Sequence, residues 1–426
     1  MYRTLAAMLA ALPCAVSLCA IAAQAQDIPQ TVAPSFAPLT LEQAIVAAGG
    51  RAPAAEAAQA GVEAARAART VAGLRPNPEV QTQIENIVGS GQYRDFNSAE
   101  TTVSVAVPIE LGGKRSARIA VADAQSDRAR LLAAIAQADI RLQVTQLYVD
   151  AVATERRLVT AKDQARIAAD VHRAAQIRVQ AGRASPIEEQ RADVARLYAE
   201  ANAERAVRLA QAAHANLARR VGQPTVAALD PAALDLLPMR YGPESPASAA
   251  GTLALAAADA DLAIADAGVR FARSERMPDL NVGPGVRRLS QTGDTALMLS
   301  VSMPIPLFNA GRAGVAQARA EQNRSEAQKR ATALDVEQAI TTARAEAANA
   351  LVTARAASGP ALLAAQEAAR IARIGYREGK FGQLDLLDAE RTLAETRIAA
   401  IDALAAYQNA QAQLERLTAP APQQGN

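Results

Sequence analysis

Four short segments of the 426-residue chain alternate between apolar and polar positions. A period of two is typical of a β-strand with one apolar and one polar face, and about ten residues suffice for a tilted strand to cross a bilayer. This periodicity alone fits a membrane barrel and an ordinary pair of half-buried hairpins equally well. The positions assigned to one face are Val80, Thr82, Ile84 and Val88; Val103, Val105 and Val107; Leu280, Val282 and Val286; and Leu297, Leu299, Val301 and Met303.

Long helices are predicted after the strand-like segments. No proline interrupts residues 112–180, and only Gly359-Pro360 interrupts residues 312–375. At 1.5 Å per residue each stretch spans roughly 100 Å. Apolar residues follow alternating four- and three-residue steps from Leu131 to Val152 and from Leu386 to Leu417, which is the seam spacing of coiled coils. A purely structural coiled coil would explain these helices but not the strands.

The pattern occurs twice along the chain. Arg115 and Arg312 follow equivalent strand ends, and Gly182 and Gly379 are separated by the same offset. Such a duplication predicts a pseudo-symmetric wall segment rather than a globular enzyme. We expect a first repeat at 26–221 and a second at 251–418, each with a helix, two strands and a helical hairpin. A proline-rich connector at 222–250 and a flexible tail at 419–426 complete the predicted organisation.

Closure of the sheet requires several copies of the chain. A four-stranded sheet with open edges cannot span a membrane, because every backbone polar group in lipid must be paired. Two copies would supply eight strands, the lower bound, and three would supply twelve. The predicted fold is therefore mainly α with a membrane β-barrel. Long helices form an α-helical coiled-coil barrel, and four β-strands per protomer close as a 12-stranded barrel in a trimer.

The N-terminus predicts export. Arg3 precedes an apolar run from Leu5 to Ala23, and Ala23-Gln24-Ala25 has the A-x-A form of a cleavage site, so residues 1–25 are read as a signal peptide rather than as a retained anchor. Both cysteines, Cys14 and Cys19, fall within it. The expected mature chain therefore has no thiol for a disulfide, a metal site or a nucleophile.

Composition and charge narrow the function further. Hydrophobic residues make up 50% of the chain, but aromatics only 3%, too little bulk for a large globular core and well suited to close helix packing. The 45 basic and 43 acidic residues are interspersed, so no nucleic-acid partner is expected. The two histidines, His172 and His214, stand among charged and small residues. Gly112-Gly113-Lys114 lacks the surrounding residues of a phosphate loop. We expect no enzymatic activity, metal site or cofactor.

These features together resemble the TolC-like outer-membrane efflux family, over nearly the whole mature sequence. Within it, the segments that look like the cobalt-zinc-cadmium (CzcC-like) branch are Glu85-Asn86, Gly89-Ser90-Gly91, Ser98–Thr102, Glu110–Arg115 and Gln383–Leu393.

The resemblance implies a function and a set of partners. The chain would be the outer-membrane channel subunit of a tripartite, RND-type efflux system that exports divalent heavy-metal cations. It would extend from the outer membrane into the periplasm. The implied partners are two further copies in a homotrimer, outer-membrane lipid, a periplasmic membrane-fusion adaptor and an inner-membrane RND pump. Two alternatives stay open: the same architecture serving drug efflux or type I secretion, and a soluble periplasmic coiled-coil adaptor or scaffold.

The resemblance also implies a gate. Asp385 and Asp388 match two aspartates that ring the periplasmic aperture in the family, where three copies would bring six carboxylates together and attract cations. They are one helical turn apart, and without the resemblance an exposed acidic pair is more simply a solvated helix face. Tyr376 and Glu188 match polar positions of the family's closing network.

The helical hairpin tips are the expected adaptor contacts. Phe381 stands where the best-known family member has arginine, so Arg377 or Lys380 is expected to replace that latch. The predicted docking tips comprise Gly182, Arg183, Ser185, Gly379 and Lys380.

Overall fold

The computed structural model describes residues 38–224, 228–238 and 247–422. The predicted signal peptide, parts of the predicted connector and the last residues of the predicted tail lie outside the described residues. The described residues belong to one structural unit. Within the described ranges, no helix has the combined length and apolarity to cross a bilayer.

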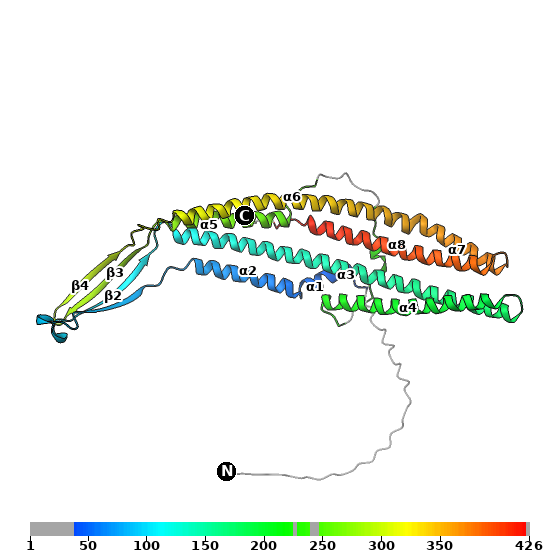
Figure 1. Ribbon diagram of the computed structural model, residues 1–426, viewed down its shortest axis with the longest axis horizontal. Coiled ribbons are helices and arrows are strands. Elements are labelled where there is room, and N and C mark those ends of the chain that lie inside the picture. Colours follow the sequence, from blue (N-terminus) through cyan, green and yellow to red (C-terminus); the bar gives the residue numbers. More distant parts are fainter. Residues whose placement is uncertain (1–37, 225–227, 239–246, 423–426) are drawn as a thin grey trace, which may run out of the picture. The chain divides into compact units, whose positions relative to one another are not determined.

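Each half of this unit contributes helices and two strands (Figure 1). The first half contains α1 (Leu41–Gly49), α2 (Pro53–Ala72), β1 (Glu79–Glu85), β2 (Glu100–Ile109), α3 (Lys114–Gln180) and α4 (Pro186–Val221). The second contains α5 (Leu253–Ser274), β3 (Leu280–Leu289), β4 (Thr295–Ser302), α6 (Arg312–Ala356), α7 (Leu362–Arg377) and α8 (Gln383–Leu417). Short 3-10 turns are η1 (Gly91–Tyr93), η2 (Asp95–Ser98) and η3 (Pro231–Asp235), and the π-helix η4 (Ala357–Ala361) joins α6 to α7.

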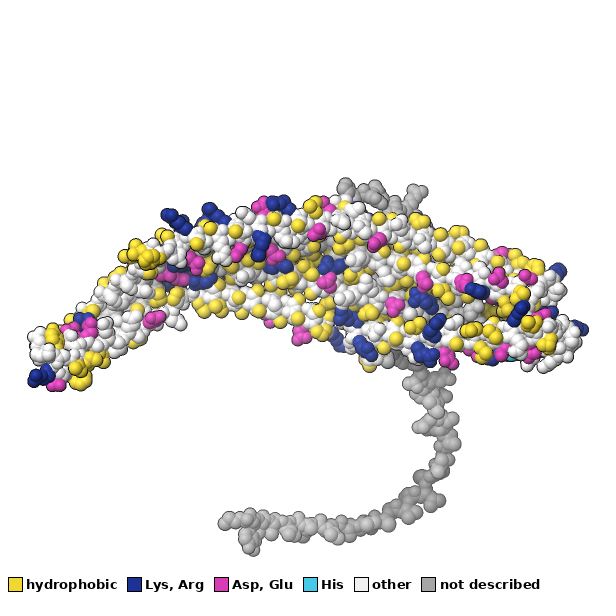
Figure 2. All heavy atoms as spheres, viewed as in Figure 1, with side chains coloured by type: hydrophobic (Ala, Val, Ile, Leu, Met, Phe, Trp, Pro, Cys, Tyr) yellow, Lys and Arg dark blue, Asp and Glu magenta, His cyan; other side chains and the backbone are white. Residues whose placement is uncertain are grey.

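The four predicted strands form one antiparallel sheet in the order β1-β2-β3-β4. Its register places Val80 opposite Val105, and Val286 between Val103 and Leu297. Most apolar side chains on this face are exposed. Figure 2 shows hydrophobic and charged side chains interspersed over both the strand end and the helices. The four predicted strands and their apolar face are therefore confirmed, except that Val88 and Met303 lie beyond the ends of β1 and β4.

The opposite face of the sheet is polar. Arg287 forms ion pairs with Glu100 at 2.9 Å and with Glu85 at 3.3 Å, and its Nε donates to the Thr102 hydroxyl at 3.0 Å. A Cβ atom on Gly285 would lie 2.7 Å from the Ser104 Cβ, so the close approach of the two strands leaves room only for glycine at position 285. In the described part of the chain, β1 and β4 each pair with one neighbour only, which leaves two open edges.

The helices follow the predicted interruptions. α3 runs for 67 residues without a break, whereas α6 and α7 are separated by η4, where Gly359 leaves the helical region with φ −101° and ψ −105°. Both observations confirm the predicted helices. The break falls at Gly359-Pro360 because Pro360 has no N–H to donate and its ring crowds the preceding turn.

A buried cluster ties the middle of the helices to the connector. The hydroxyl of Tyr148 on α3 donates to the Leu39 carbonyl at 2.8 Å and accepts from the Asp230 N–H at 3.3 Å. Leu229 and Leu234, on either side of that aspartate, are buried in the same cluster. The described part of the 222–250 segment thus packs against the helices part-way along their length.

The two faces of the sheet should respond oppositely to arginine. Val105→Arg places a cation on the apolar face, which costs about 2 to 4 kcal/mol at the middle of a membrane. Ser104→Arg, the adjacent residue on the polar face, is the matched control. We expect assembled oligomer in the membrane fraction to fall in the first variant and persist in the second. Equal loss in both would show that the faces are wrongly assigned.

Candidate functional site

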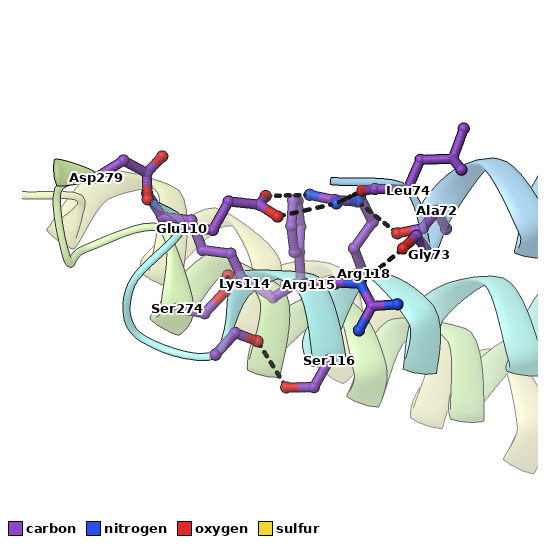
Figure 3. Close-up of polar contacts among 12 residues, drawn as sticks. Ala72, Gly73, Leu74, Glu110, Lys114, Arg115, Ser116, Arg118, Ser274 and Asp279 are labelled. Atoms are coloured by element: carbon purple, nitrogen blue, oxygen red, sulfur yellow. Dashed lines mark hydrogen bonds and ion pairs between the residues drawn. The ribbon is translucent and has the colours of Figure 1, made fainter. Parts of the chain in front are cut away.

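Where the sheet meets the helices, a charged joint fixes the start of α3 (Figure 3). The Arg118 guanidinium donates to both Glu110 oxygens, at 2.6 and 3.3 Å, and to the carbonyls of Ala72 and Leu74, at 2.8 and 3.0 Å. Arg115 adds a hydrogen bond to the Gly73 carbonyl at 2.6 Å. These carbonyls belong to the C-terminal end of α2, which lacks intrahelical donors and carries a partial negative charge.

The same joint fastens the second half of the chain. Asp279, just before β3, accepts from Lys114 Nζ at 2.7 Å and from the Leu111 N–H at 3.2 Å. Gly112 has φ +69°, and a Cβ there would lie 2.8 Å from the Met277 Cβ. The Glu110–Arg115 motif is therefore a joint between β2 and α3. The duplication of this motif made it recognisable in the sequence, but the residues that it contacts could not be predicted from the sequence.

The joint should be sensitive to loss of Arg118. Arg118→Ala leaves Glu110 and two carbonyls without their donor, and each lost hydrogen bond to a charged or buried group costs about 1 to 3 kcal/mol. We expect a lower melting temperature in detergent. Arg330→Ala removes an exposed ion pair within α6 and is the control, because such pairs contribute about 0 to 1 kcal/mol. Equal melting temperatures in the two variants would contradict the role of the joint.

The two hairpin tips lie at the end of the unit away from the strands (Figure 1). Gly182 at φ +70° follows α3, and the Arg183 N–H donates to the Arg178 carbonyl at 2.9 Å. Gly379 at φ +74° follows α7, and the Lys380 N–H donates to the Gly375 carbonyl at 2.8 Å. Both turns use the left-handed conformation in which glycine ends helices. Ser185 precedes α4 in an extended conformation.

The two aspartates lie exposed on the first two turns of α8. An oxygen of Asp385 accepts from the Gly382 N–H at 2.9 Å, so this side chain satisfies one of the free donors at the helix start. Asp388 follows one turn later. The single chain thus gives Asp385 a local structural role in addition to any role in a ring of carboxylates.

Tyr376 and Glu188 lie where the two hairpins meet. The guanidinium carbon of Arg178 stands 5.5 Å from the centre of the Tyr376 ring, within range of a cation–π interaction. The Gln383 amide donates to the Glu188 carbonyl at 3.4 Å. Sequence reasoning missed Arg178, and it named Gln383 only as the first residue of a family segment without predicting its contact, because each acts across the two halves of the chain. A buried apolar cluster also joins the hairpins through Val171, Ala175, Ala192, Ala372 and Leu386.

Phe381 packs back onto its own hairpin. A Cβ on Gly375 would lie 2.2 Å from the Phe381 ring, so only glycine fits beneath it. The two expected substitutes for the family arginine are engaged locally. Lys380 Nζ pairs with Glu378 at 2.7 Å, and Arg377 Nε donates to the Arg373 carbonyl at 3.4 Å.

A buried carboxylate joins α7 to α8. Glu390 is 2% exposed and accepts two hydrogen bonds from Arg373, one of them at 2.7 Å. This interaction raises the pKa of the Arg373 guanidinium. Asp193 is the equivalent of Glu390 in the first hairpin, where it pairs with Arg196 at 2.8 Å and lies 3.8 Å from His172. The two acids are separated by the same offset as Gly182 and Gly379, but their partners differ.

The histidines lie beside single carboxylates. His214 Nε2 is 2.7 Å from a Glu155 oxygen, on the α3–α4 hairpin. Among the residues that the structure describes, no group of three or more His, Cys, Asp or Glu side chains is placed to hold a metal ion.

Comparisons with known proteins match almost the whole chain. Residues 44–223 and 247–419 fit the family model of outer membrane efflux proteins. The cobalt-zinc-cadmium resistance protein CzcC of Cupriavidus metallidurans is 30% identical over 89% of this chain and 90% of its own. The nickel and cobalt resistance protein CnrC of the same organism is 30% identical over 69% of this chain and 71% of its own. The open-state structure of the MtrE outer membrane channel of Neisseria gonorrhoeae superimposes with a TM-score of 0.73 at 21% identity, covering 89% of this chain and 88% of MtrE.

Proposed function

Because the chain belongs to the outer membrane efflux protein family, we propose that it is the outer-membrane channel of a tripartite system that exports divalent heavy-metal cations. The observation that carries the metal cargo is the match to a cobalt-zinc-cadmium resistance protein over 89% of the chain. Family membership and the apolar, exposed strand face argue against the alternative of a soluble periplasmic adaptor.

The open-edged sheet supports assembly as a homotrimer. β4 of one copy would pair with β1 of the next, which satisfies the edge donors and acceptors that lipid cannot. Three copies give twelve strands, with the apolar face toward outer-membrane lipid and the polar face, including Arg287, toward the lumen. The predicted signal peptide would supply export.

The hairpin tips support docking at the periplasmic end. Gly182 and Gly379 are exposed, and a Cβ on either would meet no described atom within 4 Å, which leaves room for a helical partner. Together with Arg183, Ser185 and Lys380 they form the proposed contact with a periplasmic membrane-fusion adaptor, which would connect the channel to an RND pump. Asp385 and Asp388 would ring the aperture, with Tyr376 and Glu188 in the closing network.

The aperture proposal predicts block by multivalent cations. Three copies of Asp385 and Asp388 would concentrate six carboxylates, whose affinity for cations rises in a narrow, partly desolvated ring. We expect a trivalent cation added from the periplasmic side to block the purified channel in planar bilayers. The double change of Asp385→Asn and Asp388→Asn should raise the blocking concentration. Asparagine removes the charge but keeps an oxygen that can cap α8.

The control for that experiment is Asp163→Asn, which neutralises a half-buried carboxylate on α3 near Arg166 and Arg397. An unchanged blocking concentration in the double variant would mean that the aspartates are only a solvated helix face.

The proposed metal cargo is tested by the metal sensitivity of a strain that lacks this chain. A strain lacking this chain, grown with cobalt, zinc, cadmium or nickel salts, should regain resistance when the wild-type chain is restored, and Val105→Arg should not restore it. A panel of drugs and dyes is run in parallel. Restored resistance to the drugs and not to any metal would replace metal export with drug efflux.

A further inference from the structure

The apolar face of the sheet ends in a row of polar side chains. Across the four strands, the register places side by side Ile84, Thr101, Arg288 and Thr295. The preceding row on the same face, which contains Val286, has valine or leucine in three strands. The strands lead away from the helices (Figure 1), so the polar row lies at the end of the sheet farthest from them.

Two neighbouring arginines point to opposite faces of this end. Successive residues of a strand alternate in facing, and Arg287 lies on the polar face, paired with Glu85 and Glu100. Arg288 is exposed on the apolar face. In the described part of the chain, no carboxylate forms an ion pair with its guanidinium. Arg288 is therefore a cation without a counter-charge on a face that is otherwise uncharged.

A neighbouring copy would not supply the missing charge. The acidic residues of the four strands share the polar face with Arg287, and they are Glu79, Glu85 and Glu100. In the proposed β4–β1 pairing, the next copy would present the outward residues of β1, which are Val80, Thr82 and Ile84. The counter-charge for Arg288 would thus have to come from outside the protein.

The depth of Arg288 indicates where that charge lies. Leu280 begins the apolar face of β3, and Arg288 follows eight residues later, roughly 27 Å along the strand at 3.4 Å per residue. A strand tilt of about 40° reduces this to roughly 20 Å of depth, close to the height of about 25 Å of the apolar band in bacterial barrels. Arg288 would therefore lie at the boundary between acyl chains and headgroups.

The adjoining β1–β2 connection also suits a membrane boundary. Its two aromatic side chains, Tyr93 and Phe96, are exposed, and barrels carry girdles of aromatic residues at both membrane interfaces. The guanidinium group is the side chain best matched to phosphate, because its planar set of donors can make two parallel hydrogen bonds. The hydroxyls of Thr101 and Thr295, on either side of Arg288, are further donors of the kind that phosphate oxygens accept.

Building on the proposed trimeric channel, we propose that Arg288 binds the phosphate of an outer-leaflet lipid, flanked by Thr101 and Thr295. The occupant is lipid A, the phosphorylated glycolipid of that leaflet. A lipid is favoured over soluble phosphate because the polar row continues directly into the apolar face that would contact acyl chains. Each copy of the channel would hold one such lipid at its outer rim.

Titration of lipid A into the purified trimer tests the site, with bound lipid counted by native mass spectrometry. Arg288→Gln should weaken binding about tenfold, the scale of one hydrogen bond to a charged group. Thr101→Val keeps a β-branched strand residue and should weaken binding less. The control is Arg94→Gln, which removes the same charge from the exposed connection between η1 and η2 and should leave binding at the wild-type level.

Two further ligands identify what is recognised. Dephosphorylated lipid A should bind wild type as weakly as lipid A binds Arg288→Gln, and inorganic phosphate at the same concentration should not displace lipid A. Tight binding of the dephosphorylated lipid, displacement by inorganic phosphate, or equal loss in Arg288→Gln and Arg94→Gln would overturn the site. If wild type is a trimer and Arg288→Gln binds lipid A equally, the site is wrong and the channel proposal stands. A wild-type monomer in detergent would overturn both.

Discussion

The need to pair every backbone N–H and C=O in lipid determines most of this architecture. A sheet of four strands with one apolar face has no stable position in a bilayer while its edges are open. The isolated sheet would also be unstable in water, because its apolar face would then be exposed to solvent. In the proposed channel the fold is completed by other copies, and the chain is one sector of a wall.

Charged side chains stabilise the sheet, the joint and the region near the hairpin tips in different ways. On the polar face of the sheet, Arg287 neutralises two carboxylates that neighbouring strands bring together. At the joint, Arg118 satisfies the free carbonyls of α2 and holds β2 and α3 in a fixed relation to it. Near the tips, the partly exposed Arg373 pairs with Glu390, whose carboxylate is buried between α7 and α8, where an unpaired carboxylate would be costly.

Local sequence patterns predicted the helices and strands, whereas contacts between segments distant in the sequence could not be predicted. Alternation located the four strands and their apolar face because a strand's facing depends only on its own sequence. Gly359-Pro360 located the helix break for the same reason. The partners of Arg118 were not predictable, since two of them are main-chain carbonyls 44 and 46 residues away. Likewise, Asp385 matched a family position, but its hydrogen bond to the Gly382 N–H is visible only in the turn geometry.

The two hairpins, though related by duplication, differ in mechanical compliance. α3 is one continuous helix of 67 residues, so any bending of it is distributed along its length. The equivalent run of the second half contains η4, where Pro360 removes a donor and Gly359 departs from helical geometry. Bending there is concentrated at one point, roughly 30 Å from the tip at 1.5 Å per residue. Around the closed wall that we propose, stiff and jointed elements would therefore alternate.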